Sequence, residues 1–185
     1  MKQFKSILVT GGAGFVGSHL VRRMINHYPE TQFVNFDALA YSGDLSNLED
    51  CSSLPNYQFV KGNINNFKEL LKLFEAHNFD AIIHLAAIVG DPACKLYPDL
   101  AIKTNWDSSR WLIDKCKELG ISKFIFASTC SNYGKMDDPE VYVDENSILA
   151  PVSLYAELKV KFENYMLSEM KKDNRFLPTS LRFST

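Results

Sequence analysis

Short apolar runs alternate along the chain with longer segments in which apolar residues recur every three or four positions. Short runs that are apolar throughout are typical of strands buried on both faces of a sheet. They predict strands over residues 6–10, 31–36, 57–61, 80–85, 123–127 and 177–183. The longer segments predict helices that begin at Gly14, at Phe67, near Ile102 and after Pro151. This alternation predicts an α/β fold with a doubly wound parallel sheet.

Two long segments without helical or strand periodicity follow predicted strands. They cover residues 37–56 and 131–151. In an open α/β sheet, ligands bind outside the carboxyl ends of the strands, so both loops are candidates for a binding site. The length of 185 residues is close to that of one domain, and we expect residues 1–185 to form a single one.

Composition and charge exclude several classes of protein. The chain holds 20 Lys and Arg against 22 Asp and Glu, and no basic run of the kind that binds nucleic acid. No apolar run approaches the roughly 18 residues that span a bilayer, and we expect neither a signal peptide nor a membrane partner. The four cysteines are widely spaced, which argues against a zinc site or a disulfide framework and favours a cytoplasmic protein.

A glycine-rich turn joins the first predicted strand to the first predicted helix. Gly11, Gly14 and Gly17 recur at a spacing of three, and Gly12 adds the alternative pattern Gly12-x-Gly14-x-x-Gly17. Glycine lets the backbone approach a pyrophosphate closely, and a helix N-terminus offers free N–H groups and a positive dipole end. The turn therefore predicts a dinucleotide site. The alternative is a tight turn needed only for packing of the helix on the sheet.

Asp37 ends the second predicted strand, 20 residues after Gly17. A carboxylate at this place accepts hydrogen bonds from the adenosine ribose of a dinucleotide. It would repel a 2′-phosphate, and residues 38–40 include no arginine to receive one. We therefore expect NAD rather than NADP as the cofactor. The alternative is an aspartate that only caps a helix or orders a loop.

Tyr155 and Lys159 are four residues apart in a predicted helix and so share a face. The pKa of a free tyrosine is about 10, and a nearby ammonium favours the phenolate. Such a pair taken alone is usually a solvated helix face. Here residues 126–134 place several hydroxyls at the end of the fifth predicted strand, beside the expected cofactor. A hydroxyl there can align a substrate oxygen with a phenolate base.

Taken together, these motifs resemble the extended short-chain dehydrogenase/reductase family, which includes nucleotide-sugar epimerases and dehydratases. The resemblance rests on residues 10–20 (TGGAGFVGSHL), Asp37, 84–87 (HLAA), 104–105 (TN), 128–134 (STCSNYG) and the Tyr155-x-x-x-Lys159 pair. It runs in order along nearly the whole chain. It implies a Rossmann domain that binds NAD, together with a C-terminal domain that holds a nucleoside diphosphate sugar.

The resemblance also implies roles for individual residues. Tyr155 matches the catalytic base, Lys159 the residue that binds the nicotinamide ribose and lowers the tyrosine pKa, and Thr129 the catalytic Ser/Thr. Asn105 matches an asparagine near the active site. The implied cofactor contacts are Gly11, Gly14, Phe15, Val16, Gly17, Asp37, Asn63, Ile64, Leu85, Ala86, Ala87, Asn105, Tyr155 and Lys159.

The chain departs from the family pattern in several places. The adenine-contacting pair, usually Asp-Ile, is Asn63-Ile64. Residues 33–48 resemble the dTDP-glucose 4,6-dehydratases, but those enzymes follow the catalytic threonine with Asp-Glu, where this chain has Cys130 and Ser131. We therefore rank an epimerase, or a related reductase of the same family, above a dehydratase. Asn132 stands where the family usually has valine, and nothing in the sequence explains it.

Length is a further departure, because family members continue for well over a hundred residues. The substrate domain is then largely absent, no second complete domain is expected, and we expect little turnover from these residues alone. A non-catalytic NAD-binding module is the alternative of another class; a structural subunit has no positive support.

Three further features bear on catalysis, metal binding and assembly. His84 lies in an apolar strand, where histidine is more often a hydrogen-bonded structural residue than a base. The acidic residues within 137–145 fit no calcium loop, so we expect no metal. The resemblance suggests a homodimer through helices near 98–118 and 152–171, with Trp106, Trp111 and Met166 as candidate surface.

Overall fold

Six parallel strands form one sheet in the computed structural model, which describes residues 4–40, 42–135 and 142–184. The strands are β1 (Ser6–Thr10), β2 (Gln32–Asp37), β3 (Tyr57–Lys61), β4 (Ala81–His84), β5 (Lys123–Thr129) and β6 (Leu177–Phe183). Their order across the sheet is β3-β2-β1-β4-β5-β6. The chain therefore winds outward from β1 in one direction and from β4 in the other, which confirms the predicted doubly wound sheet. Ligands bind at the carboxyl edge of such a reversal point.

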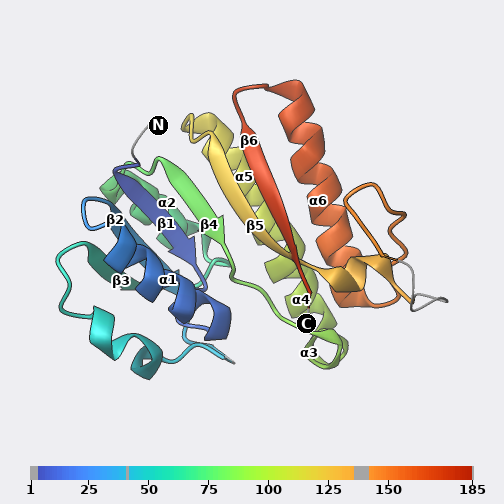
Figure 1. The fold of residues 1–185 in the computed structure, drawn as a ribbon, viewed down its shortest axis with the longest axis horizontal. Helices are drawn as coiled ribbons and strands as arrows, with labels where there is room; N and C mark the ends of the chain where they lie inside the picture. Colours follow the sequence, from blue (N-terminus) through green and yellow to red (C-terminus); the bar gives the residue numbers. More distant parts are fainter. Residues whose placement is uncertain (1–3, 41, 136–141, 185) are drawn as a thin grey trace.

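Helices cover both faces of this sheet (Figure 1). They are α1 (Phe15–His27), α2 (Phe67–Ala76), α3 (Asp91–Leu96), α4 (Pro98–Ile102), α5 (Ser109–Glu118) and α6 (Leu154–Lys172). Between them lie 3-10 helices at Leu45–Cys51 and Cys130–Tyr133, and a π-helix at Lys103–Ser108. Helix α1 packs on one face, while α2, α5 and α6 share the other.

The central strands β1 and β4 are mostly apolar because alternate side chains enter two different cores. Leu8 and Ile82 face the core under α2, α5 and α6, whereas Ile7 and Ile83 face the core under α1. All four are at most 5% exposed. Burial on both faces is why these strands read as runs rather than as alternations of apolar and polar residues.

The predicted helix over 102–116 is three consecutive elements in the structure. Helix α4 ends at Ile102, the π-helix covers Lys103–Ser108, and α5 begins at Ser109. Helix α3 was not predicted. Periodicity placed the start of the next helix near Ile102, whereas α4 begins at Pro98, as the resemblance implied, and proline in the first turn is a typical helix-start signal. The loop predicted over 37–56 contains the 3-10 helix Leu45–Cys51, whose N-cap Asp44 accepts a hydrogen bond from the Ser46 amide.

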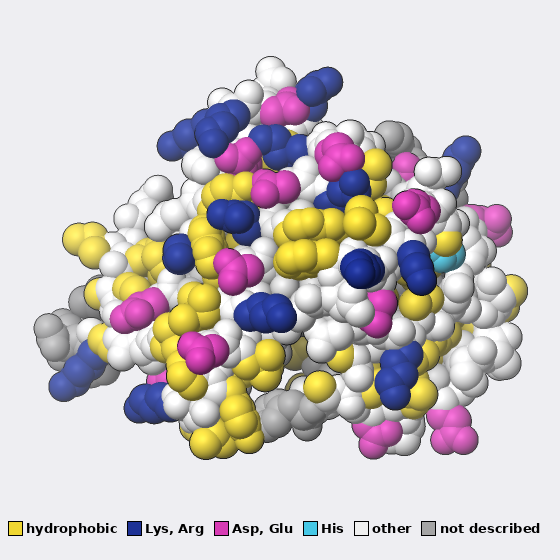
Figure 2. Space-filling model, turned by 180° about the vertical axis from the view of Figure 1, so that it is seen from behind, with side chains coloured by type: hydrophobic (Ala, Val, Ile, Leu, Met, Phe, Trp, Pro, Cys, Tyr) yellow, Lys and Arg dark blue, Asp and Glu magenta, His cyan; other side chains and the backbone are white. Residues whose placement is uncertain are grey.

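The face seen in Figure 2 carries charges of both signs, mixed with small apolar patches, and neither sign gathers into one field. Among the described residues, no helix is long and apolar enough to cross a membrane. All three side chains suggested for a dimer surface pack in or against the larger core. Met166 is fully buried, and Trp111 stacks on Phe67 with ring centroids 5.0 Å apart. The homodimer itself stays a prediction.

Candidate functional site

The glycine turn forms a cradle at the carboxyl end of β1. Gly11 has a φ of +75°, and a Cβ there would lie 2.5 Å from the Ala86 backbone nitrogen. A Cβ on Gly17 would lie 2.3 Å from the Gly11 carbonyl oxygen. Side chains at either position would therefore close the space between the turn, α1 and the end of β4.

The N-terminus of α1 opens into this cradle. Its N-cap is Gly14, which supplies no side-chain acceptor, and the first turn holds no acidic residue. Phe15 and Val16 in that turn are 78% and 52% exposed. Free N–H groups with the positive end of the helix dipole favour a phosphate anion. These residues therefore fit a dinucleotide pyrophosphate.

Asp37 is 8% exposed at the end of β2 and orders two segments of backbone. Its Oδ2 accepts a hydrogen bond of 2.9 Å from the Ala13 amide, and its Oδ1 accepts one of 2.8 Å from the Leu39 amide. Asp37 therefore does order a loop, as the alternative interpretation of this residue states. Each carboxylate oxygen keeps a further lone pair, so the same group can also accept from a ribose hydroxyl.

His84 joins β1, β4 and α5 through a buried chain of hydrogen bonds. Its Nδ1 lies 2.7 Å from Thr10 Oγ1, and its Nε2 lies 2.8 Å from Ser109 Oγ. Because Ser109 Oγ donates to the Thr104 carbonyl, Nε2–H is the donor to Ser109. Burial lowers the pKa of His84 to about 3, so the ring is neutral. These contacts support the structural interpretation of His84 rather than a catalytic one.

Asn105, in the π-helix, holds the segment that follows β4. Its Nδ2 donates to the Ile88 carbonyl, and its Oδ1 accepts from the Ile88 amide, both at 2.8 Å. The side chain is 2% exposed. Asn105 therefore acts on the site by shaping the backbone after Leu85 and Ala86. Single π turns recur at functional sites, because the extra residue redirects a side chain inward.

Tyr155 and Lys159 lie on the inner face of α6, with exposed fractions of 9% and 3%. Ser153 caps the helix just before them, accepting from the Ala156 amide. The Lys159 Nζ donates a 2.7 Å hydrogen bond to the Ala127 carbonyl of β5. It also lies 5.6 Å from the centre of the Tyr155 ring. The predicted pair is thus brought together and fixed to the end of the central sheet.

The resemblance implies that Lys159 lowers the pKa of Tyr155, but in the cofactor-free structure this pKa is raised. The pKa of the phenol is raised to about 12, mainly by burial and in smaller part by the neighbouring Cys94, Asp91 and Cys130. Burial also lowers the pKa of Lys159 to about 8. Sequence reasoning missed Cys94, which packs with Tyr155 in a small buried cluster, because nothing in the spacing of the two residues connects them.

Thr129 ends β5 and caps the 3-10 helix Cys130–Tyr133. Its Oγ1 accepts a 3.1 Å hydrogen bond from the Ser131 amide and donates one of 3.1 Å to the Ser131 hydroxyl. The side chain is half-buried and faces the carboxyl edge of the sheet. Cys130 follows directly and is close enough to Tyr155 to affect its pKa, which links this turn to α6.

The suggested adenine and cleft residues occupy the adjoining strand ends. Ile64, after β3, is 4% exposed within the larger core, whereas Asn63 is exposed. The Asn63 Oδ1 accepts a local hydrogen bond of 2.9 Å from the Asn65 amide. Leu85, Ala86 and Ala87 are half-buried after β4. Contact of these residues with a cofactor stays a prediction.

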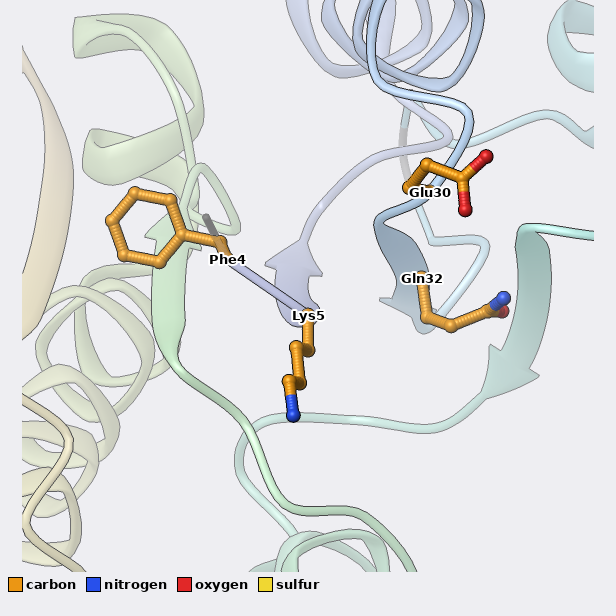
Figure 3. Close-up of a pocket in the computed structure, with 4 residues that line it drawn as sticks. All are labelled: Phe4, Lys5, Glu30 and Gln32. Carbon is orange, nitrogen blue, oxygen red and sulfur yellow. The ribbon is translucent and has the colours of Figure 1, made fainter. Parts of the chain in front are cut away.

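A shallow pocket of about 470 Å³ lies away from this edge. It is lined by Phe4, Lys5, Glu30 and Gln32, at the amino ends of β1 and β2. In Figure 3 the Phe4 ring and the Lys5 amine point away from the Glu30 carboxylate, so no polar groups converge there. The carboxyl edge, with its glycine cradle and buried Tyr155–Lys159 pair, is the better candidate site. No group of three His, Cys, Asp or Glu side chains within the described ranges could hold a metal.

Known proteins match this chain over nearly all of its length. A family model described as the NAD-dependent epimerase/dehydratase family matches residues 7–185. The dTDP-D-glucose 4,6-dehydratase of Mus musculus is 34% identical over 171 residues, which cover 89% of this chain and 46% of that protein. The chain thus spans about half the length of such curated relatives.

Two solved structures have the same arrangement. The UDP-Glc/GlcNAc 4-epimerase of Campylobacter jejuni superposes with a TM-score of 0.88 at 30% identity, over 96% of this chain and 53% of that one. The dTDP-glucose 4,6-dehydratase of Bacillus anthracis, solved in complex with NAD, gives 0.85 at 31% identity, over 96% and 54%.

Proposed function

The chain belongs to the NAD-dependent epimerase/dehydratase family, and we propose that it is the cofactor-binding and catalytic part of an enzyme that oxidises a hydroxyl of a nucleoside diphosphate sugar. The observation that carries this proposal is the pair Tyr155 and Lys159, buried at the carboxyl edge that also holds the glycine cradle. A module that only bound a dinucleotide would have no need to bury a lysine and a tyrosine together there. A buried cation is costly and is found where it has a function.

The side chains then divide the work as follows. Tyr155 takes up the proton of the reacting sugar hydroxyl, and the Thr129 hydroxyl hydrogen-bonds the same oxygen. Lowering the pKa of Tyr155 from about 12 toward neutrality requires about 7 kcal/mol of differential stabilisation. The Lys159 ammonium contributes part of this, because it lies beside the phenol ring. Bound NAD would supply the hydride acceptor and a second positive charge at this place.

An epimerase is favoured over a dehydratase by the two residues that follow Thr129. Elimination of water needs an acid and a base, and a carboxyl pair would serve both roles. Here the positions hold Cys130 and Ser131. The Ser131 backbone and side chain are both engaged by Thr129. The dehydratase remains the second candidate, because a relative that matches the chain at 34% identity is a dTDP-D-glucose 4,6-dehydratase.

Turnover of nucleotide sugars by the full-length natural gene product tests this proposal. The protein is incubated with NAD and a panel of UDP- and dTDP-sugars, and the products are identified by NMR. We expect interconversion of epimers without loss of water. Tyr155→Phe should lower the rate by about a thousandfold while leaving NAD affinity unchanged.

Tyr165→Phe is the matched control on the same helix, because the Tyr165 hydroxyl binds Asp114 rather than the site. It should leave turnover unchanged. A 4-keto-6-deoxy product would instead favour the dehydratase. NAD binding without turnover of any sugar would contradict the enzyme proposal and favour a binding module.

A further inference from the structure

Glu163 forms a buried polar cluster on α6, one turn beyond Lys159. Its side chain is 2% exposed and forms an ion pair of 2.7 Å with the Arg182 Nη2 of β6. It also accepts hydrogen bonds of 2.9 Å from the Ser180 hydroxyl and 3.0 Å from the Asn132 Nδ2. The Arg182 guanidinium holds the pKa of Glu163 below its usual range, together with the hydroxyl donors, so the group is a carboxylate at neutral pH.

Asn132 connects this carboxylate to the turn that carries Thr129. Its Nδ2 donates both to Glu163 and, at 3.0 Å, to the hydroxyl of Ser128. Ser128 and Asn132 flank the segment of Thr129, Cys130 and Ser131. The end of β5 is also held from α6 by the hydrogen bond of Lys159 to the Ala127 carbonyl. Helix α6, which bears Tyr155, is therefore hydrogen-bonded to the chain on both sides of Thr129.

The asparagine is retained at an energetic cost. Asn132 is fully buried, and among the described residues its Oδ1 has no hydrogen-bond partner. A buried carbonyl without a partner is destabilising, whereas an apolar side chain of similar size would carry no such penalty. What an apolar residue could not supply is the N–H donor that joins Glu163 to Ser128. This accounts for the polar residue that the sequence left unexplained.

Arg182 connects this cluster to the loop that follows the 3-10 helix Cys130–Tyr133. Its Nη1 donates a hydrogen bond of 2.9 Å to the Tyr133 hydroxyl, and that hydroxyl donates one of 2.9 Å to the Asp144 carbonyl. The Ala150 amide donates to the Asn132 carbonyl at 3.0 Å. Both ends of the 3-10 helix after Thr129 are thus tied to groups connected with Glu163.

We propose that Glu163 is a positioning residue, which holds the Thr129 hydroxyl in register with Tyr155 through the buried contacts of Asn132. This proposal rests on the proposed function in one respect, which is the reaction whose rate the Thr129 hydroxyl affects. Glu163 itself is buried beneath the turn, so its role is to position other groups. Its effect is on the rate of the chemical step, because a displacement of a catalytic group by about 1 Å can lower a rate by about a hundredfold.

Kinetics of Glu163→Gln in the full-length protein test this role. The new amide presents an N–H group to Asn132 or Arg182, both of which are donors, so at least one contact is lost. We expect kcat to fall by about ten- to a hundredfold, with KM for the sugar and Kd for NAD within about twofold of the original. Glu169→Gln is the matched control: Glu169 is 6% exposed on the same helix and pairs with Lys117 and Lys172, away from the site. It should leave kcat unchanged.

A double variant shows whether Glu163 acts through Thr129. If it does, Thr129→Val with Glu163→Gln should be no slower than Thr129→Val alone, because residues that act as a unit are not additive. Rate losses that multiply would overturn the proposal. Should Glu163→Gln fail to fold, Asn132→Leu leaves the ion pair with Arg182 intact. It should still lower kcat by about tenfold.

Amide hydrogen exchange on this chain provides a readout independent of turnover. Glu163→Gln and Asn132→Leu should raise exchange over residues 128–134 by about tenfold or more, while Glu169→Gln should not. Unchanged exchange there would overturn the proposal even if no sugar is turned over. Raised exchange in a protein without turnover would refute the proposed function and leave the positional role of Glu163 standing.

Discussion

Replacing Lys159 by methionine should stabilise the cofactor-free protein at neutral pH. The amine is 3% exposed, and burial lowers its pKa from the ordinary 10.5 to about 8. Keeping the proton on this buried group at pH 7 therefore costs about 3 kcal/mol relative to the unfolded chain. Methionine has a similar shape and carries no charge, so the substitution removes this cost.

Two contacts of Lys159 are lost in the same substitution. The hydrogen bond to the Ala127 carbonyl contributes about 1 kcal/mol. The ammonium lies 4.4 Å from the centre of the Phe126 ring, a cation–π contact that contributes about 1 kcal/mol. The net expectation for Lys159→Met at pH 7 is a gain of about 1 to 2 kcal/mol in the free energy of unfolding.

The sign of the pH dependence separates this account from simple packing. Between about pH 8 and 10.5 the unfolded chain holds more protons at this lysine than the folded protein does. The stability contributed by this group in the original protein therefore rises with pH across that window. The advantage of the variant should shrink as the pH rises and reverse at about pH 9 to 9.5.

Urea unfolding followed by tryptophan fluorescence measures both effects. Lys161→Met, on the same helix, is the control, because the Lys161 side chain is exposed over Trp106. The loss of its cation–π contact with Trp106 should lower stability by up to about 1 kcal/mol, without the pH dependence. A variant Lys159→Met that is less stable at pH 7, or one whose advantage is independent of pH, would refute the reasoning.

Three further predictions follow from the geometry. Gly11→Ala should lower NAD affinity by about a hundredfold in a titration, because its Cβ would lie 2.5 Å from the Ala86 nitrogen at a positive φ; unchanged affinity would place the cofactor elsewhere. The free energy of unfolding should fall by up to about 5 kcal/mol as the pH drops from 6.5 to 3, since burial lowers the His84 pKa to about 3, and His84→Gln should flatten that slope. Asn105→Leu should raise amide exchange at Ile88 by about tenfold, because both of its backbone hydrogen bonds are lost; equal exchange would argue against the clamp.

The central strands β1 and β4 could be predicted from the sequence, because both of their faces are buried. The apolar run over 6–10 coincides with β1. The segment over 57–61 coincides with β3, although this strand includes Gln58 and Lys61 and none of its side chains is fully buried. The interruption of the predicted helix that begins near Ile102 by a π turn could not be found in this way. Periodicity of apolar residues does not distinguish the register before Ser109 from that after it. The hydrogen bond between Asn105 in the π-helix and Ile88 joins residues 17 apart, which periodicity does not register either.

The candidate site was predicted as a set of residues but not as an electrostatic environment. The pair Tyr155 and Lys159 follows from spacing, yet the raised pKa of Tyr155 depends on burial beside Cys94, which is distant in sequence. Glu163 and Asn132 are 31 residues apart, and their contact depends on how α6 crosses the end of β5. A carboxylate one turn after Lys159 on the buried face of a helix was the one signal in the sequence that pointed to this cluster.

Calorimetric titration of this chain with NAD, and with NADP for comparison, tests the central claim most directly. The glycine cradle, the open N-terminus of α1 and the carboxylate of Asp37 predict that NAD binds and that NADP binds at least about tenfold more weakly. Equal affinities would contradict the role of Asp37. No binding of either dinucleotide would contradict the assignment of this edge of the sheet as a cofactor site.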